Sequence, residues 1–204
     1  MAAFDSSHIK ISPGTLYIAP LGSTEPTSVT GAWPAAWVEL GYTDTGSTFQ
    51  FGPTTANVTV EEEFYPVEEA IVTYTGKVTF VLAETTRRNL AIAMNTGVPG
   101  SAVFPSDTQG GDGLGTLYQD PPDPGEENRV MIGWDSLQKG VTTGTDPFAR
   151  FICRKTLQVG QVTRIARKGN NKAMYSCDFS IIKPPGTGTT ARPFRFFFPA
   201  YLDN

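Results

Sequence analysis

The sequence is poor in the side chains that most enzymes use for catalysis or metal binding. It contains a single histidine, His8, and two cysteines, Cys153 and Cys177, with no Cys-x-x-Cys pair. One histidine excludes His-dependent catalytic triads and His-rich metal sites, and we interpret His8 as an exposed residue of a polar tail. Both cysteines lie in strand-like segments and are predicted to be buried free thiols. We expect no metal, no other cofactor and no enzyme activity.

Long apolar runs and nucleotide-binding motifs are also missing. No window holds the roughly 18 apolar residues of a membrane helix, so we expect a soluble chain without membrane insertion. The N-terminal residues MAAFDSSHIKISPG lack the regions of a secretory signal, which favours assembly in a cytoplasm. Neither GxxxxGK[ST] nor GxGxxG follows a predicted strand, and GGDGLG at 110–115 lies in an acidic, Pro-rich loop. These absences argue against phosphate binding.

The composition predicts one mainly β domain. The 204 residues include 39% hydrophobic residues, 21 glycines and 16 prolines, which is typical of short strands joined by many turns. We predict a β-sandwich with one lateral helix and long loops. Within the single domain 1–204 we distinguish an N-terminal arm 1–13, a long loop 43–57, a strand–helix element 58–97, a Gly/Pro/Asp-rich loop 99–128 and a basic β half 129–204.

The strand–helix element carries the clearest periodicity in the chain. From Val72 to Leu82 apolar and polar residues alternate, which predicts a strand from about Ile71 to Leu82. Twelve residues span roughly 40 Å, twice the usual strand length. A helix over Thr85–Thr96 is predicted to follow, capped by Thr85 or Thr86, packed through Leu90 and Met94, and ended by Gly97 and Pro99.

Alternating or apolar segments elsewhere predict further strands. The segment Tyr175–Ile181 alternates most regularly, and Lys168–Asn171 supplies the turn residues of a hairpin before it. The expected strands are Thr15–Ala19, Val38–Leu40, Val130–Trp134, Phe148–Lys155, Leu157–Arg167, Ala173–Ile182 and Phe194–Tyr201.

The net charge of −4 conceals two oppositely charged halves. Residues 1–128 hold 16 acidic and 4 basic residues, a net −12, whereas residues 129–204 hold 4 acidic and 12 basic residues, a net +8. One interpretation is a subunit whose acidic part meets the basic part of a neighbour. The alternative, two solvated faces of one domain, has equal weight.

Five glutamates, Glu61, Glu62, Glu63, Glu68 and Glu69, form the densest acidic cluster. Such a cluster could supply a glycosidase carboxylate pair or Ca²⁺ ligands. We place it on consecutive strand residues, whose side chains alternate between faces, and EF-hand spacing is absent. A solvated or pore-facing acidic strip is therefore favoured over a hydrolase.

Three stretches resemble a known family. GTLYIAPLG at 14–22, WVELGYTDTG at 37–46 and the run from VTVEEEFYPV through TGKVTFVLAETTRRNLAIAMN are similar to major tail tube proteins of long-tailed bacteriophages, siphophages of actinobacterial hosts in particular. The order of features also matches: an N-terminal strand, a Trp and Leu-Gly strand, a long loop, acid-flanked strands, a helix and a closing β half. Residues 99–128 carry no family signature.

The resemblance implies a structural virion protein. In that family, hexameric rings join their inner sheets into a shared β-barrel and stack into the hollow tail tube. The tube is expected to assemble in the host cytoplasm around a tape measure protein, to contact tail terminator and distal tail proteins, and to conduct DNA without binding it specifically. An overlong strand then finds its partners in neighbouring subunits.

Two sets of charged residues are candidates for this function. We expect carboxylates among Glu61, Glu63, Glu68 and Glu69 to line the lumen, because a basic lining would retain DNA. The basic residues near a predicted hairpin tip are interpreted as a solvated tip or as candidates for contact with a neighbouring subunit's acidic residues, in preference to nucleic-acid recognition, since aromatic residues are not interleaved with them. They are Arg164, Arg167, Lys168 and Lys172.

Other functions remain as alternatives. The tube of a contractile tail or of a secretion-type injection apparatus would share the same features. A β-sandwich adhesin or carbohydrate-binding module would present Trp33, Trp37 and Tyr42 to sugars, although aromatic residues at strand positions more often belong to the core.

Overall fold

The structure is a computed structural model, and it describes residues 14–44, 46–97, 121–125, 127–137, 147–162 and 174–198. Several predicted features lie outside these residues. They include the N-terminal arm 1–13 with His8, most of the loop 99–128, and the hairpin turn at Lys168–Asn171. The fold is therefore built from about two thirds of the chain.

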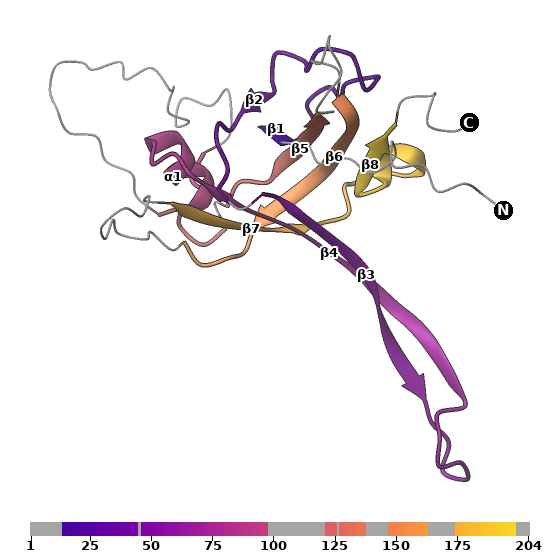
Figure 1. The fold of residues 1–204 in the computed structure, drawn as a ribbon. Helices are drawn as coiled ribbons and strands as arrows, with labels where there is room; N and C mark the ends of the chain where they lie inside the picture. The colour runs from indigo at the N-terminus through magenta and orange to yellow at the C-terminus, as the bar shows by residue number, and fades with distance from the viewer. Residues whose placement is uncertain are drawn as a thin grey trace, which may run out of the picture.

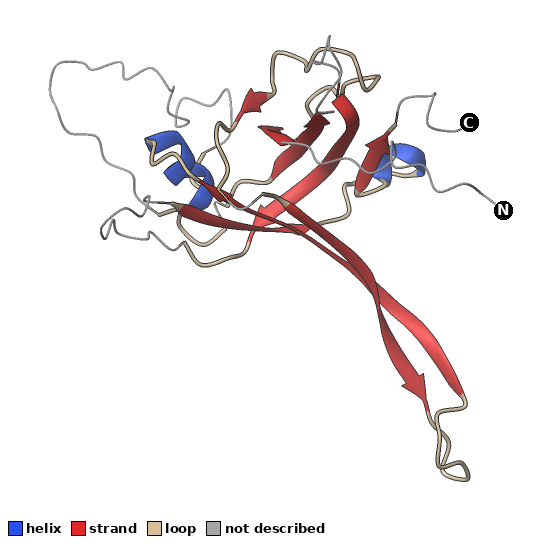
Figure 2. Ribbon diagram, in the orientation of Figure 1, coloured by secondary structure: helices blue, strands red, loops and turns tan. Residues whose placement is uncertain are grey.

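The described strands form one antiparallel sheet with a branch (Figures 1 and 2). Their order is β2-β1-β5-β6-β7-β4-β3, and β8 pairs with β6 beside this path. Strand β6 is the branch point of the sheet. One of its edges pairs with β5, and its other edge pairs first with β8 and then with β7. The bounds are β1 Gly14–Pro20, β2 Val38–Glu39, β3 Thr48–Val58, β4 Glu68–Leu82, β5 Val130–Leu137, β6 Pro147–Gln158, β7 Tyr175–Ile181 and β8 Phe194–Phe197.

This single sheet folds over so that its two halves enclose one core. Phe49 of β3 packs edge-on against Trp134 of β5 and Phe151 of β6, although several strands separate them in the sheet order. The core cluster accordingly combines β1, β5 and β6 with β4 and β7, including Leu16, Ile132, Phe80 and Phe179. The mainly β fold with a lateral helix is confirmed, and the two layers are continuous through hydrogen bonds rather than separate sheets.

Helix α1, Arg87–Ala93, is shorter than the predicted Thr85–Thr96. Thr86 caps it as predicted, since its hydroxyl accepts from the Asn89 amide at 3.1 Å. The helix ends at Asn95, which takes φ 62° and so occupies the left-handed position expected for Gly97. Leu90 packs against the core as predicted, although it is half-buried; the fully buried residues of this face are Asn89, Ile92 and Ala93, and Met94 is half-buried.

Three sequence predictions about strands are wrong. Residues 48–58 of the supposed loop 43–57 form strand β3, because they find a full-length partner in β4. Residues 59–67 are the connection between those strands, so Glu61, Glu62 and Glu63 do not lie on a strand. Leu157 and Gln158 continue β6 and 159–162 form a loop, so no separate strand begins at Leu157; residues 163–173 lie outside the described part.

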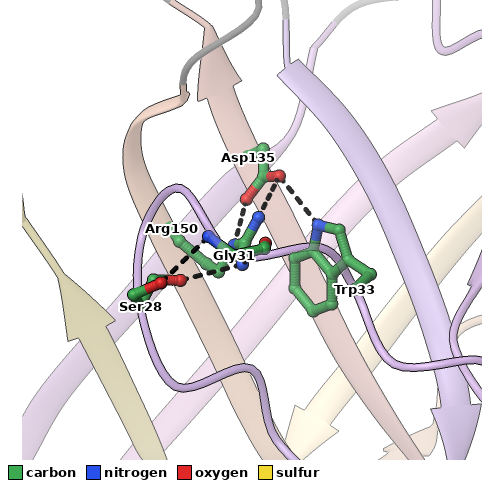
Figure 3. A network of polar contacts seen from close by, with 5 residues as sticks. All are labelled: Ser28, Gly31, Trp33, Asp135 and Arg150. Atoms are coloured by element: carbon green, nitrogen blue, oxygen red, sulfur yellow. Dashed lines mark hydrogen bonds and ion pairs between the residues drawn. The ribbon is translucent and has the colours of Figure 1, made fainter.

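A buried ion pair ties the loop between β1 and β2 to the sheet (Figure 3). Arg150 of β6 donates to both carboxylate oxygens of Asp135 on β5 at 2.7 and 2.8 Å, and to the Ser28 and Gly31 carbonyls at 2.9 and 2.7 Å. Trp33 Nε1 donates to the same carboxylate at 2.7 Å, and the guanidinium lies over the Trp33 ring. Because both charges are buried and almost fully hydrogen-bonded, this cluster fixes the loop against the body.

Candidate functional site

The most unusual part of the molecule is the distal half of the β3–β4 hairpin, which projects away from the body (Figure 1). We call residues 53–75 the arm, its turn 59–67 the tip, and the part of the hairpin that rejoins the body, Thr48–Gly52 with Gly76–Leu82, the root. The arm strands pair with each other as far as Val58 and Glu68. The Val67 amide then bonds to the Val58 carbonyl at 3.0 Å and closes the tip.

Every residue of the arm is exposed, on both faces of the hairpin. A strand on the surface of a stable domain normally buries one of its faces. Here the arm carries eight large exposed apolar side chains without any core beneath them, four on its strands and four in its tip, which is typical of a surface that another molecule covers. They are Val58 (44% exposed), Val60 (42%), Phe64 (102%), Tyr65 (82%), Val67 (54%), Ile71 (55%), Val72 (66%) and Tyr74 (58%).

The arm also presents two open backbone edges. Among the described strands, β3 pairs only with β4. Strand β4 pairs with β7 only from Lys77 to Leu82, so its other edge has no described partner from Glu68 to Gly76. Unpaired edges are templates for strands of other chains. Pro53, which lacks an amide hydrogen, interrupts the donors of β3 at one position.

A β-bulge lies in the middle of the arm. Thr54 pairs with Thr73 and Thr55 pairs with Ile71, so Val72 is the extra residue. A bulge bends the strand, increases its twist and exchanges the two faces beyond it. The alternation read from the sequence between Val72 and Leu82 therefore describes the root, where Val78, Phe80 and Leu82 are buried, and it does not continue past the bulge.

The root anchors the arm through aromatic and ionic contacts. Phe49 packs against Phe151, Phe194 and Phe196 at centroid distances of 4.6, 5.1 and 5.6 Å. On the opposite face, Lys77 Nζ donates to Asp178 of β7 at 2.8 Å. Further out, Phe51 stacks on Tyr74 at 5.4 Å with an interplanar angle of 2°. Packing thus decreases step by step from the root outward.

A cavity opens beside the root, at the point where the arm leaves the body. It has a volume of about 680 Å³, and its walls come from β3, β4, the end of β7 and the loop before β8. Its apolar lining includes Phe51, Tyr74, Ile181 and Pro193. Among the described residues that line it, the charged ones are Lys183 and Arg192, both of them exposed. We call this feature the root cavity.

The candidate acidic residues all lie on the arm. Glu61 and Glu63 are in the tip, whereas Glu68 and Glu69 begin β4, where they pair with Val58 and Asn57. As neighbours on a strand, Glu68 and Glu69 point to opposite faces. Residues 53–75 carry five glutamates and no basic residue, a net −5. The candidate basic residues Arg164, Arg167, Lys168 and Lys172 lie outside the described residues.

The aromatic residues proposed for sugar binding do not form an exposed platform. Trp37 is buried at 6% exposure and its Nε1 donates to the Thr24 carbonyl at 2.9 Å. Trp33 is half-buried, stacks on Tyr17 and donates a hydrogen bond from Nε1 to the Asp135 carboxylate. Of the three aromatic residues, Tyr42 alone is exposed. This arrangement favours the core role of the tryptophans.

The two cysteines are free and fully buried, as predicted. Burial raises the pKa of the Cys153 thiol, and burial together with the nearby Asp178 charge raises the pKa of Cys177 to about 12. Both thiols are therefore protonated at neutral pH and unreactive in the folded body. Across the described residues, no cluster of three or more His, Cys, Asp or Glu could hold a metal ion, and no helix could span a membrane.

Sequence reasoning found β4 but missed its partner and the aromatic tip. The alternation of Phe49 and Phe51 and the β-branched residues that follow were usable signals for β3. Gly52 and Pro53 obscured them, because both residues are typical of loops. No sequence pattern signals the root cavity, since its walls come from four separate segments.

Comparison with known proteins gives one family and no close curated relative. The family described as phage tail tube protein matches residues 1–134 of the chain. The matched region includes the arm, the root strands and helix α1. No curated protein matches the chain.

Proposed function

Because this chain belongs to the phage tail tube protein family, we propose that it forms hexameric rings that stack into the hollow tail tube of a virion and that this tube conducts the genome into the host cell. The coarse assignment, a structural component of the tail, follows from the family. The ring, its stacking and the passage of DNA are the proposal. The tape measure protein in the lumen and the terminator and distal proteins at the two ends complete the set of proposed partners.

The single observation that carries the proposal is the arm. It combines two open strand edges with apolar side chains on both faces, so one neighbouring chain could not cover it fully. In a ring, the arm of each subunit would lie between two others, and pairing along both edges would close the strands into a barrel. Closure removes every exposed edge.

The energetics agree with this role. Burying an apolar side chain completely contributes about 1.5–3 kcal/mol, so each of the six roughly half-exposed arm residues would contribute about 1 kcal/mol when covered, and Phe64 and Tyr65, which are almost fully exposed, about 2 kcal/mol each. The eight residues together approach the cost of association, which is about 4–15 kcal/mol. Edge hydrogen bonds and a second neighbour would then favour assembly.

We also propose that carboxylates of the arm contribute to the surface of the lumen. Glu68 and Glu69 are the stronger candidates, because they lie on β4 and any barrel built from the arms must place one of them inside. A negative lining repels the phosphate backbone and lets DNA pass without adhering. Assembly in the host cytoplasm belongs to the same proposal.

Negative-stain electron microscopy of the concentrated protein tests the proposed function. We expect hollow filaments with a regular axial repeat. A variant in which Ile71 and Val72 are both replaced by lysine should remain a folded monomer without filaments, since these side chains touch no core. Exposed body residues replaced in the same way, Ala35→Lys and Ala36→Lys, should leave the filaments intact. A stable monomer that binds glycans under all conditions would contradict the proposal.

A further inference from the structure

We propose that the root cavity is a socket that receives the tip of the arm from a second copy of this chain. The inference rests on the proposed function, because it states which two surfaces meet when subunits join. It differs from edge pairing, which concerns the backbone of the arm strands. The exposed tip and the open root cavity have complementary shape and chemistry.

The tip presents aromatic side chains that are suited to insertion into a partner's surface. Phe64 is 102% exposed and Tyr65 is 82% exposed, so both rings extend entirely into solvent. A short turn holds them there, with the Glu63 amide bonded to the Val60 carbonyl at 3.3 Å. Pro66 follows Tyr65 and restricts the backbone. Two adjacent, fully exposed aromatic rings on a constrained turn are typical of anchor residues at an interface.

The root cavity has the size and lining that such an anchor needs. Its volume of about 680 Å³ lies within the range of sites that enclose drug-sized ligands, so two aromatic side chains fit. Phe51 and Tyr74 present a stacked aromatic wall, and Ile181 and Pro193 add aliphatic surface. Gly76, Gly186 and Gly188 leave room because they carry no side chain.

The charges of the two surfaces are opposite. Glu61, Glu62 and Glu63 directly precede the tip aromatics and are all exposed. Lys183 and Arg192 are the charged residues of the root cavity, and the ion pairs described in the structure involve neither of them. An acidic tip approaching this cavity is attracted and oriented, whereas a basic segment is repelled.

Geometry requires that the tip come from another copy. The arm runs away from the body (Figure 1), and about nine residues separate the Gly76 wall of the root cavity from Val67 at the tip. Thr73, the wall residue nearest the tip in sequence, is still six positions from Val67, so at about 3.3 Å per residue a chain's own tip lies roughly 20 Å or more from the walls of its own cavity. The contact is therefore head-to-tail: each copy offers one tip and one socket, and the contact repeats from subunit to subunit.

Cross-linking between two singly substituted proteins tests the socket. One protein carries Thr59→Cys in the tip, which keeps Phe64, Tyr65 and the three glutamates, and the other carries Thr73→Cys in the root cavity, which leaves Lys183 and Arg192 intact. The native cysteines are fully buried and do not compete. After mixing under assembly conditions, a short bis-maleimide should join the two proteins at least about tenfold more efficiently than it joins the control pair, since docking raises the local thiol concentration.

The control pair combines Thr59→Cys with Arg87→Cys, an exposed position on helix α1 outside the root cavity. Equal cross-linking of the two pairs would overturn the proposal. So would a Thr73→Cys monomer that fails to react with a single maleimide, since another segment of the same chain would then fill the cavity. Filaments seen by microscopy without the tip-to-cavity cross-link would overturn the socket alone. The absence of both filaments and cross-link would contradict the proposed function as well.

Discussion

The body and the arm differ in what surrounds their side chains. In the body, large residues such as Phe151 and Ile132 are at most 1% exposed, and the buried charges of Arg150 and Asp135 satisfy each other. In the arm no residue is buried at all. The two regions nevertheless share strands β3 and β4, which pass from one environment to the other within a few residues.

This difference separates folding from assembly. The body contains the apolar core and the polar cluster that stabilise a single subunit, whereas the arm beyond the Phe51–Tyr74 stack contains side chains expected to stabilise contacts with other subunits. Substitutions should therefore fall into two classes, those that change the free energy of unfolding and those that change filament formation. The predictions below test that separation.

The largest effect is expected in the body, from Arg150→Met. The substitution leaves the Asp135 carboxylate buried with Trp33 as its remaining donor and removes the donors to Ser28 and Gly31. Breaking a buried pair in this way costs about 3–5 kcal/mol of the free energy of unfolding, as urea denaturation of the monomer would show. The double variant Arg150→Met with Asp135→Leu should lose less, because no charge is left unpaired. A loss below about 1 kcal/mol for the single variant would show that the cluster does not stabilise the body.

Alanine substitutions at three phenylalanines of the same hairpin should lower the free energy of unfolding by amounts that decrease from the root to the tip. Phe49→Ala removes a ring that packs against four aromatic side chains and should cost about 2–4 kcal/mol in unfolding free energy. Phe51→Ala, which loses contacts with Tyr74 and Phe194, should cost about 1 kcal/mol. Phe64→Ala should leave the monomer within about 0.5 kcal/mol of the unsubstituted chain. Equal losses at the three positions would contradict the division between body and arm.

Replacing Glu68 and Glu69 with lysine should slow genome passage without changing the stability of the fold. They replace two negative charges of the arm by positive ones, so phosphates would adhere to the proposed lumen. We expect tubes of normal appearance and DNA release from virions that is slower by about tenfold, equivalent to about 1.4 kcal/mol in the barrier. Lysine at the exposed body residue Asp123 is the control. Unchanged release from well-formed tubes would refute the lumen assignment.

The smallest effect concerns helix α1, which belongs to the body. Thr86→Ala removes the hydroxyl that accepts from the Asn89 amide and should lower the unfolding free energy by about 1 kcal/mol. Thr86→Ser keeps the acceptor and should restore most of it. Both variants should assemble normally. A Thr86→Ala subunit that folds normally but fails to form filaments would place assembly contacts outside the arm.

The sequence predicts the body better than it predicts the arm. Period-two alternation located most of the body strands because burial of one face imposes it, as in Tyr175, Cys177 and Phe179 of β7. In the arm no face is buried within the chain, so nothing imposes alternation, and β3 beyond Gly52 was assigned to a loop. The predicted length of β4 was still informative. A strand of about twelve residues is twice the usual length, which indicated that it finds partners beyond its own subunit.

The candidate site was predictable only in part. The sequence alone shows that five glutamates lie close together between residues 61 and 69. Their division between the tip and β4 depends on where the chain turns, which Pro66 alone did not reveal. The root cavity depends on long-range packing, since Phe51 and Arg192 are brought together only when β3 and the segment before β8 fold onto the same end of the body.

Hydrogen exchange measured by mass spectrometry on monomers and on assembled tubes tests the central claim most directly. An isolated hairpin is marginally stable, so amides of the arm should exchange rapidly in the monomer while those of β5, β6 and β7 are protected. In tubes, the account predicts strong new protection across residues 53–75 and little change in the body strands. Arm amides that exchange as rapidly in tubes as in the monomer would contradict it.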